Sequence, residues 1–217
     1  MSDTIAHRPA AEVRRIPDRA CYDRETINAI LDEALYCHLG FIVDGHPVVI
    51  PTIHVRVDDH LVLHGSPASR MMRALKAGAG ISIAVTLLDG LVLARSVFHH
   101  SMNYRSVVLF GSGRVIDDPE EKMEAMRVFT DKILPGRWGE ARQPTEKEFR
   151  GTLMVAVPID AASAKMRTGP PADSDEDTGL PIWAGVIPYA LRPGDPIPAA
   201  DLPDGVGFPA YLQHLID

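Results

Sequence analysis

The stretch HGSPASR at residues 64–70 combines two hydroxyl side chains and a guanidinium where an apolar strand leads into a helix. The free backbone N–H groups and the positive dipole of a helix start favour an anion. Ser66 and Ser69 add hydroxyl donors, and Arg70 can add a charged, bidentate contact. The stretch therefore predicts a phosphate-binding site. The alternative is structural: Ser66 caps a helix over residues 68–77 and Arg70 is solvated.

A second polar cluster, HHSMNYRS at residues 99–106, lies just before and at the start of an apolar strand. It offers imidazole, hydroxyl, amide, phenol and guanidinium groups. Such an array suits a planar heteroaromatic ligand with carbonyls and ring nitrogens along its edge. A polar turn that leads into an ordinary strand explains the same residues without a ligand, and both interpretations stay open here.

Other signatures of catalysis or metal binding are missing from the sequence. The central histidines show neither an HExxH motif nor Cys/His metal spacing, so we predict no metal site. There is no GxSxG serine elbow, and the stretch GSG at residues 111–113 lacks the third glycine of a dinucleotide-binding fingerprint. The histidines considered are His54, His60, His64, His99 and His100.

The charge is concentrated at one end of the chain. The 217 residues hold 22 Lys+Arg and 29 Asp+Glu, a formal net charge of −7, and residues 170–217 alone hold eight acids and one base, Arg192. A neutral body with an acidic end argues against a nucleic-acid partner, which needs a basic surface. Two cysteines, Cys21 and Cys37, are too few for a disulfide scaffold. With no membrane-length apolar run and no signal-peptide core, we expect a cytoplasmic protein with no membrane partner.

Apolar periodicity and turn residues predict a mainly β chain with flanking helices. Six or seven strands joined mostly by tight hairpins, among them turns at Asp44-Gly45 and Asp89-Gly90, imply an antiparallel sheet. Their lengths favour a closed barrel over an open sheet. The expected strands are 37–43, 48–57, 60–64, 81–88, 91–97, 104–116 and 153–159; the expected helices are 24–36, 68–77, 119–134 and a short one opened by the capping box at residues 145–148.

Two local predictions concern caps and faces. Asp23 and Asp118 are the expected N-caps of the helices that follow them. Within the strand 48–57, Thr52, His54 and Arg56 should form a polar face opposite an apolar one.

The chain divides into three expected parts: an N-terminal arm at 1–20, a barrel domain at 21–169 and a tail at 170–217. The tail holds nine of the 18 prolines and cannot form a core of its own. Because it contains Trp183 within an apolar stretch, we expect residues 180–189 to dock as an ordered strap. Residues 173–177, which are mostly acidic, should remain a mobile, solvated loop.

Four landmarks together resemble the pyridoxamine 5′-phosphate oxidase-like superfamily of flavin-binding split barrels, in particular the flavin-nucleotide-binding branch that includes nitroimidazole-resistance proteins. The resemblance covers roughly residues 20–190. The landmarks are LGFIV at 39–43 with Pro51-Thr52, LHGSPASR at 63–70, HSMNYRSVVLFG at 100–111, and AKMRTGPP at 164–171 followed by WAG at 183–185.

The resemblance implies a six- to seven-stranded antiparallel split β-barrel of the Greek-key type that binds FMN between the two subunits of a homodimer. Ser69 and Arg70, supported by Ser66, would hold the phosphate, and Thr52 and Thr86 would approach the ring or the ribityl chain. Tyr104, Arg105 and Ser106 match a flavin-contacting segment, partly across the dimer interface, and Trp183 matches a tail aromatic. The candidate cofactor-binding set is Thr52, His64, Ser66, Ser69, Arg70, Met71, Thr86, Ser101, Asn103, Tyr104, Arg105, Ser106 and Trp183.

The sequence departs from true pyridoxamine phosphate oxidases at two places. Met71 stands where those enzymes carry a second basic residue, and the tail lacks their basic substrate motif. We therefore expect an FMN-dependent oxidoreductase with another small-molecule substrate or electron donor, and FAD is the alternative flavin. The alternative is a non-catalytic flavin- or haem-binding protein that stores or senses its cofactor, with a histidine as axial haem ligand. No residue is assigned as a catalytic acid or base.

Overall fold

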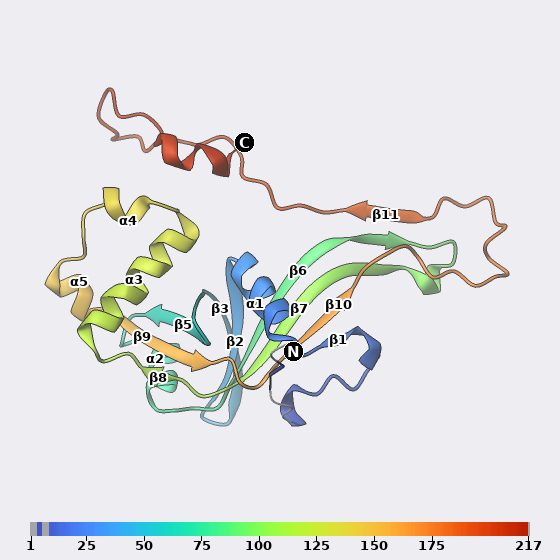
Figure 1. Cartoon of the computed structure of the whole chain (residues 1–217), viewed down its shortest axis with the longest axis horizontal. Helices are drawn as coiled ribbons and strands as arrows, with labels where there is room; N and C mark the ends of the chain where they lie inside the picture. The colour runs from blue at the N-terminus through green and yellow to red at the C-terminus, as the bar shows by residue number, and fades with distance from the viewer. Residues whose placement is uncertain (1–3, 6–8, 217) are drawn as a thin grey trace.

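The computed structural model describes residues 4–5 and 9–216 and contains two antiparallel sheets that do not close into one ring (Figure 1). The larger sheet has the order β1-β10-β7-β6-β2-β3, with β11 paired to β6, and the smaller has the order β4-β5-β9-β8. The larger sheet comprises β1 (Ala20–Cys21), β2 (Tyr36–Val43), β3 (His46–Ile53), β6 (Ile81–Leu93), β7 (Ser101–Gly111), β10 (Ala162–Arg167) and β11 (Gly185–Pro188). The smaller comprises β4 (Val55–Val57), β5 (His60–Gly65), β8 (Arg114–Val115) and β9 (Leu153–Pro158). This is the predicted mainly β, split-barrel architecture.

The helices lie at the outside of the two sheets (Figure 1). In Figure 1, α3, α4 and α5 gather beside the smaller sheet, while β6 and β7 run away from them as a long arm along which β11 lies. The α-helices are α1 (Arg24–Glu33), α2 (Arg70–Lys76), α3 (Pro119–Ile133), α4 (Arg137–Glu140) and α5 (Glu146–Arg150). The 3-10 helices are η1 (Pro9–Ala11), η2 (Pro17–Arg19), η3 (Val97–His99) and η4 (Ala210–Leu215).

Strand β5 is buried on both of its faces and separates two apolar clusters. Leu61 and Leu63 point into the main core between the sheets. Val62 points the other way, into a smaller cluster with Phe129 of α3 and Met154 of β9. Because side chains alternate along a strand, residue 64 faces the same side as Val62, toward α3.

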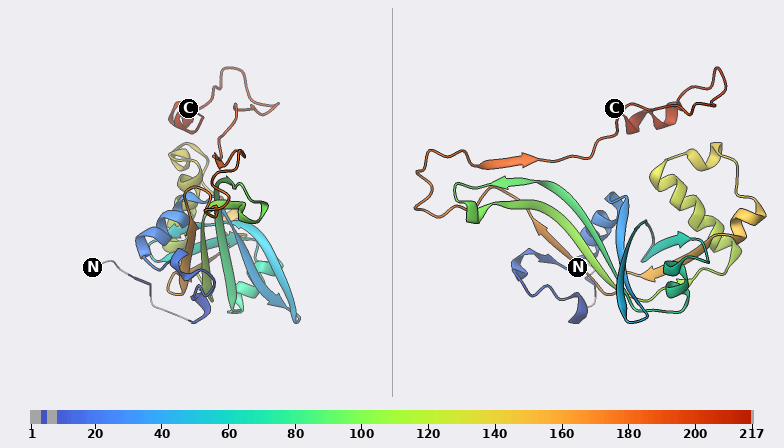
Figure 2. Two further views of the ribbon diagram at one scale, coloured as in Figure 1. Left: turned by 90° about the vertical axis from the view of Figure 1, so that its right-hand side faces the viewer. Right: turned by 180° about the vertical axis from the view of Figure 1, so that it is seen from behind.

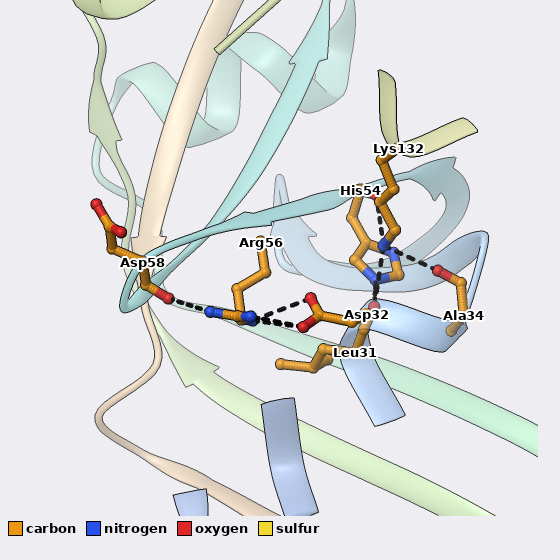
Figure 3. Close-up of polar contacts among 7 residues, drawn as sticks. All are labelled: Leu31, Asp32, Ala34, His54, Arg56, Asp58 and Lys132. Atoms are coloured by element: carbon orange, nitrogen blue, oxygen red, sulfur yellow. Dashed lines mark hydrogen bonds and ion pairs between the residues drawn. The ribbon is translucent and has the colours of Figure 1, made fainter. Parts of the chain in front are cut away.

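The predicted strand 48–57 is in fact two strands in different sheets, and His54 lies at the break between β3 and β4. His54 is fully buried rather than part of a polar face, and its Nε2 donates to the backbone carbonyl of Leu31 at 2.9 Å (Figure 3). Val55, expected on the apolar face, is also fully buried. Arg56 does reach the surface, where it pairs with Asp32 of α1. The prediction of one alternating strand was therefore wrong, because the chain changes sheets here.

The predicted hairpin at Asp89-Gly90 is also wrong, since β6 continues through it from Ile81 to Leu93 with a register shift between Leu88 and Gly90. The Asp89 carboxylate accepts bidentate hydrogen bonds from the guanidinium of Arg105 on the neighbouring β7. A Cβ atom at Gly90 would lie 2.7 Å from the carbonyl oxygen of Ile187. Gly90 therefore permits the close approach of β11, and the dipeptide forms a bulge instead of a turn.

The predicted strand 104–116 divides in the same way. β7 ends at Gly111, and β8 pairs with β9 in the smaller sheet. A Cβ atom at Gly113 would lie 2.2 Å from Cγ1 of Val155, so only glycine allows this crossing. Strand β10, which pairs with both β1 and β7, was not predicted.

Most of the predicted caps and turns are confirmed. Asp23 accepts from the Thr26 amide at 2.9 Å at the start of α1, and Asp118 accepts from the Glu121 amide at 2.8 Å at the start of α3. The capping box of residues 145–148 opens α5. Residues 44–45 have positive φ angles, 51° and 77°, as a tight hairpin requires.

The tail runs back along the whole molecule (Figure 2). β11 pairs with the outer half of β6, and Tyr211 of η4 packs against Gly136 beside α4. Asp173 is not part of a mobile loop: its side chain is 6% exposed and accepts from the Arg95 amide at 2.8 Å and the Arg95 guanidinium at 2.7 Å. Of the helices in the described residues, none is long and apolar enough to cross a bilayer.

Candidate functional site

The first candidate cluster lies where β5 passes into α2. The Ser66 carbonyl accepts from the Ser69 amide at 2.9 Å and the Ser66 hydroxyl accepts from the Ala68 amide at 3.3 Å, so residues 66–69 form a turn before the helix. The helix itself begins at Arg70, and its N-cap is Ser69, whose hydroxyl accepts from the Met72 amide at 3.2 Å. The prediction of Ser66 as N-cap was therefore wrong by one turn.

Arg70 is exposed at this helix start and forms no ion pair with any residue that the structure describes. Met71, in contrast, is buried in the main core, where it and Met72 anchor the helix. The side chain of Met71, one of the predicted cofactor-binding residues, therefore does not reach this cluster. The cluster that faces solvent consists of Ser66, Ser69 and Arg70, which is the set expected to hold a phosphate.

His64 does not join this cluster, although it is close in sequence. Its ring meets the edge of Phe129 on α3, with ring centroids 4.5 Å apart. Burial lowers the pKa of the imidazole, and Nδ1 is enclosed without a hydrogen-bond partner in the described residues. His64 lies on the opposite face of β5 from the barrel core.

The second candidate cluster, on β7, is largely engaged within the chain. Arg105 pairs with Glu33 of α1 and with Asp89 of β6, and hydrogen bonds to these two carboxylates raise the pKa of the guanidinium. Asn103 is buried, donates to the Gly169 carbonyl at 3.1 Å and accepts from Arg167.

The remaining predicted residues are more open. Ser106 donates to the Lys165 carbonyl at 2.9 Å, and Thr86 lies opposite it on β6 with an exposed side chain. Thr52 on β3, and Ser101 and Tyr104 on β7, are half-buried. Trp183, just before β11, is 64% exposed.

The structure does not bring the two clusters together within one chain. In Figures 1 and 2, α2 lies beside the smaller sheet, whereas residues 101–106 begin at the tip of the arm, which extends in the opposite direction.

A cavity that was not predicted lies on the outer face of the smaller sheet, beneath α3. Its volume is about 330 Å³, and its walls come from β5, β9, α3, α4 and the segment leading to α5. The residues include His64, Met126, Phe129, Trp138, Arg142 and Met154. The apolar stripe of α3 predicts a buried helix face, but residues this far apart in the chain give no local signal of a cavity. Among the described residues, no group of three His, Cys, Asp or Glu side chains could hold a metal ion.

The sequence matches the family model of pyridoxamine 5′-phosphate oxidase over residues 23–166, which is more than half of the chain. The chain belongs to this family. Among curated proteins, none matches it significantly.

Two solved structures in the comparison are similar over almost their whole length. The flavocytochrome Anf3 from Azotobacter vinelandii is 39% identical, with 96% of this chain and 97% of that chain covered and a TM-score of 0.90. The FAD- and haem-binding protein from Mycobacterium smegmatis is also 39% identical, with 91% and 97% covered and a TM-score of 0.87. A 5-nitroimidazole antibiotic resistance protein from Bacteroides thetaiotaomicron, 24% identical over 67% of this chain and 85% of that one, has a TM-score of 0.57 and supports the fold alone.

Proposed function

We propose that the chain is a flavin-binding redox protein whose flavin lies between two subunits, with its phosphate on the turn and helix start at residues 66–70. The observation that carries the proposal is Arg70, an exposed arginine without an ion pair in the described residues, directly after the N-cap Ser69. A guanidinium next to hydroxyl and amide donors suits a phosphate. Two relatives at 39% identity, described as a flavocytochrome and as an FAD- and haem-binding protein, support a flavin as the ligand.

FAD is favoured over the FMN that the sequence led us to expect, because the mycobacterial relative is described as binding FAD. Pyridoxamine phosphate is not proposed as the substrate. Met71 is buried where a second basic residue would be needed, and Arg192 is the only base in residues 170–217. The substrate or electron donor is proposed to be another small molecule.

A homodimer follows from where the polar clusters and the exposed apolar side chains lie. The phosphate cluster and the β7 cluster are separated within one chain, and a second copy would supply the missing half of the site. Val97 and Phe98 at the arm tip are 88% and 86% exposed, and Ile197 in the tail is 94% exposed. Exposed apolar surface of this kind is typical of a protein interface.

The flavin, when bound, would supply the redox chemistry by taking a hydride or electrons from one small molecule and passing them to another. The residues of the chain would bind and orient it. Ser66, Ser69 and Arg70 would hold its phosphate, and the exposed Thr86 and half-buried Tyr104 would offer hydrogen bonds to its ring. Arg105, fixed by two carboxylates, would keep β6 and β7 in register beneath that ring.

We also propose a reducing, cytoplasmic setting. Its support is that Cys21 and Cys37 are both free, and that burial raises the pKa of the Cys37 thiol to about 12, which makes it unreactive.

Identification of the cofactor in the purified protein tests the flavin directly. We expect a flavin absorption spectrum, and chromatography of the acid-released cofactor against FAD and FMN standards should identify FAD. Bleaching of the flavin bands by a reduced nicotinamide under anaerobic conditions would support an oxidoreductase. A protein that neither retains nor takes up flavin would overturn the proposal.

The second candidate function is cofactor binding without turnover, as in storage or sensing. The descriptions of both relatives favour it as much as they favour an enzyme, because they mention cofactors and no reaction. A bound flavin that no nicotinamide, quinone or nitro compound oxidises or reduces at a useful rate would select this alternative.

Sedimentation equilibrium at micromolar protein tests the dimer. The expected mass is twice that of the 23.7 kDa chain. A flavin-saturated monomer would contradict both the dimer and the shared site.

A further inference from the structure

The cavity beneath α3 has the size and lining of a ligand site, and the flavin proposal leaves it without a role. Its volume of about 330 Å³ falls in the range typical of small-molecule sites. Phe129 and Trp138 contribute aromatic rings, and Met126 and Met154 contribute thioethers. Such walls are apolar and easily polarised, and they suit a flat hydrophobic ligand.

One imidazole faces this otherwise largely apolar space. Alternation along β5 turns His64 toward α3, and the ring is held edge-on against Phe129. Its Nδ1 is buried without a hydrogen-bond partner in the described residues, and the ring makes no other polar contact there. A buried polar group without a partner is costly and calls for an explanation. A ligand that engages the ring would provide one.

The donors around His64 exclude one class of ligand. A bare metal ion needs three or four protein ligands, and no group of three His, Cys, Asp or Glu is found in the described part of the chain. A metal held by a single histidine must bring its other ligands with it. Haem does so, because the macrocycle supplies four nitrogens and the protein supplies an axial imidazole.

The edge of the cavity holds an ion pair. Arg142 lines it and pairs there with Glu148 through two hydrogen bonds of 2.8 and 2.9 Å. Glu148 lines the cavity as well, so a haem carboxylate would reach the Arg142 guanidinium by sharing it with Glu148 or by displacing that carboxylate.

We propose that the cavity between β5, β9 and α3 binds haem, with His64 as the ligand of the iron. The inference goes beyond the proposed flavin function, and it agrees with the descriptions of two relatives as a flavocytochrome and as an FAD- and haem-binding protein. It does not depend on the flavin site, because His64 and Arg70 lie on different sides of the smaller sheet. Neither description says where haem is held.

The experiment compares haem uptake by the full-length wild type, His64→Gly and His60→Gly. His60 is the matched control, because it lies on β5 four residues earlier, on the same face, and outside the cavity. Each protein is titrated with haemin and followed by its Soret band, and flavin content is measured on the same samples. We expect saturation at one haem per wild-type chain, at least ~10-fold weaker binding in His64→Gly, and wild-type binding in His60→Gly. Imidazole added to His64→Gly should restore the Soret band position of the wild-type haem complex.

A second variant guards against loss of the fold. His64→Gln is close in size to histidine and should keep the cavity and the flavin while losing the axial bond, which electron paramagnetic resonance of the ferric protein detects. A wild type that binds no haem in the titration overturns the haem proposal, whatever its flavin content. A wild type that binds haem while both His64 variants keep its affinity and ferric spectrum overturns the assignment to this cavity. An unchanged flavin content in these variants shows that the flavin proposal is unaffected by either result.

Discussion

The ammonium of Lys132 on α3 donates to the backbone carbonyl of His54 at 3.4 Å, at the point where the chain leaves one sheet and enters the other. The same ammonium donates to the carbonyls of Leu31 and Ala34 at 3.0 and 3.1 Å (Figure 3). These two carbonyls lie at the C-terminal end of α1, where intrahelical donors run out. One side chain of α3 therefore joins α1 to the break between β3 and β4.

Lys132→Met should destabilise the fold by about 2–4 kcal/mol, because three charge-assisted hydrogen bonds are lost and their carbonyls remain in a half-buried place. Urea unfolding followed by circular dichroism measures the change. Lys147→Met, at an exposed position on α5, is the matched control and should change stability by no more than ~0.5 kcal/mol. Equal stabilities for the two variants would show that Lys132 does not join these elements.

His54 should make the stability depend on pH in a definite window. Burial, followed by the charge of Lys132, lowers the pKa of His54 to about 4 from an ordinary value of 6.5. Between these values the unfolded chain takes up a proton that the folded chain does not, so stability falls as the pH drops from 6.5 to about 4. The full contribution of this histidine is about 3 kcal/mol.

The measurement is the free energy of unfolding at several pH values for the wild type and His54→Gln. The glutamine amide can replace the hydrogen bond to Leu31 but does not titrate. The variant should therefore lose less stability between pH 6.5 and 4.5 than the wild type. Parallel pH profiles would mean that another group causes the dependence.

The parts of the fold that could be predicted from sequence are those with local signals. The caps at Asp23 and Asp118 and the turn at Asp44-Gly45 each depend on a few consecutive residues. The errors occur where distant partners override such signals. Asp89-Gly90 resembles a hairpin turn, but Arg105 binds the aspartate and β11, almost a hundred residues later, covers the glycine.

The candidate site divides in the same way. The phosphate cluster at residues 66–70 is contiguous and was predicted, with its N-cap misplaced from Ser69 to Ser66. Arg105 and Asn103 were expected to face a ligand but are held by side chains and a carbonyl that only the folded chain brings near. The cavity at His64 was missed because its walls come from residues 64–154, and no window of the sequence contains them together.

Arg70→Ala should weaken FAD binding by about 1.5–3 kcal/mol, because a charge-assisted contact to a phosphate of the cofactor is lost. Arg73→Ala, an exposed arginine one turn later on α2, is the matched control and should have a smaller effect. Fluorescence titration of each variant with FAD and with riboflavin, which lacks phosphate, measures the two effects. If Arg70→Ala weakened the two ligands equally, the phosphate assignment would be wrong.

Gly90→Ala should release β11 from β6. The added Cβ would lie 2.7 Å from the Ile187 carbonyl oxygen and 3.2 Å from Cα of Pro188, so backbone atoms must move apart. The hydrogen bonds that join β11 to β6 should then open more often, and so should the bond from the Tyr189 amide to the Asp89 carbonyl.

Gly80→Ala is the matched control, because the same substitution there meets no atom within 4 Å. We expect hydrogen exchange of the amides of Ile187 and Tyr189, which lie at the hydrogen-bonded positions of this pair, to accelerate by at least ~10-fold in Gly90→Ala only. If the tail strap completes the flavin site near Trp183, flavin fluorescence should rise in parallel, whereas faster exchange with unchanged fluorescence would show that the strap covers β6 without contributing to that site.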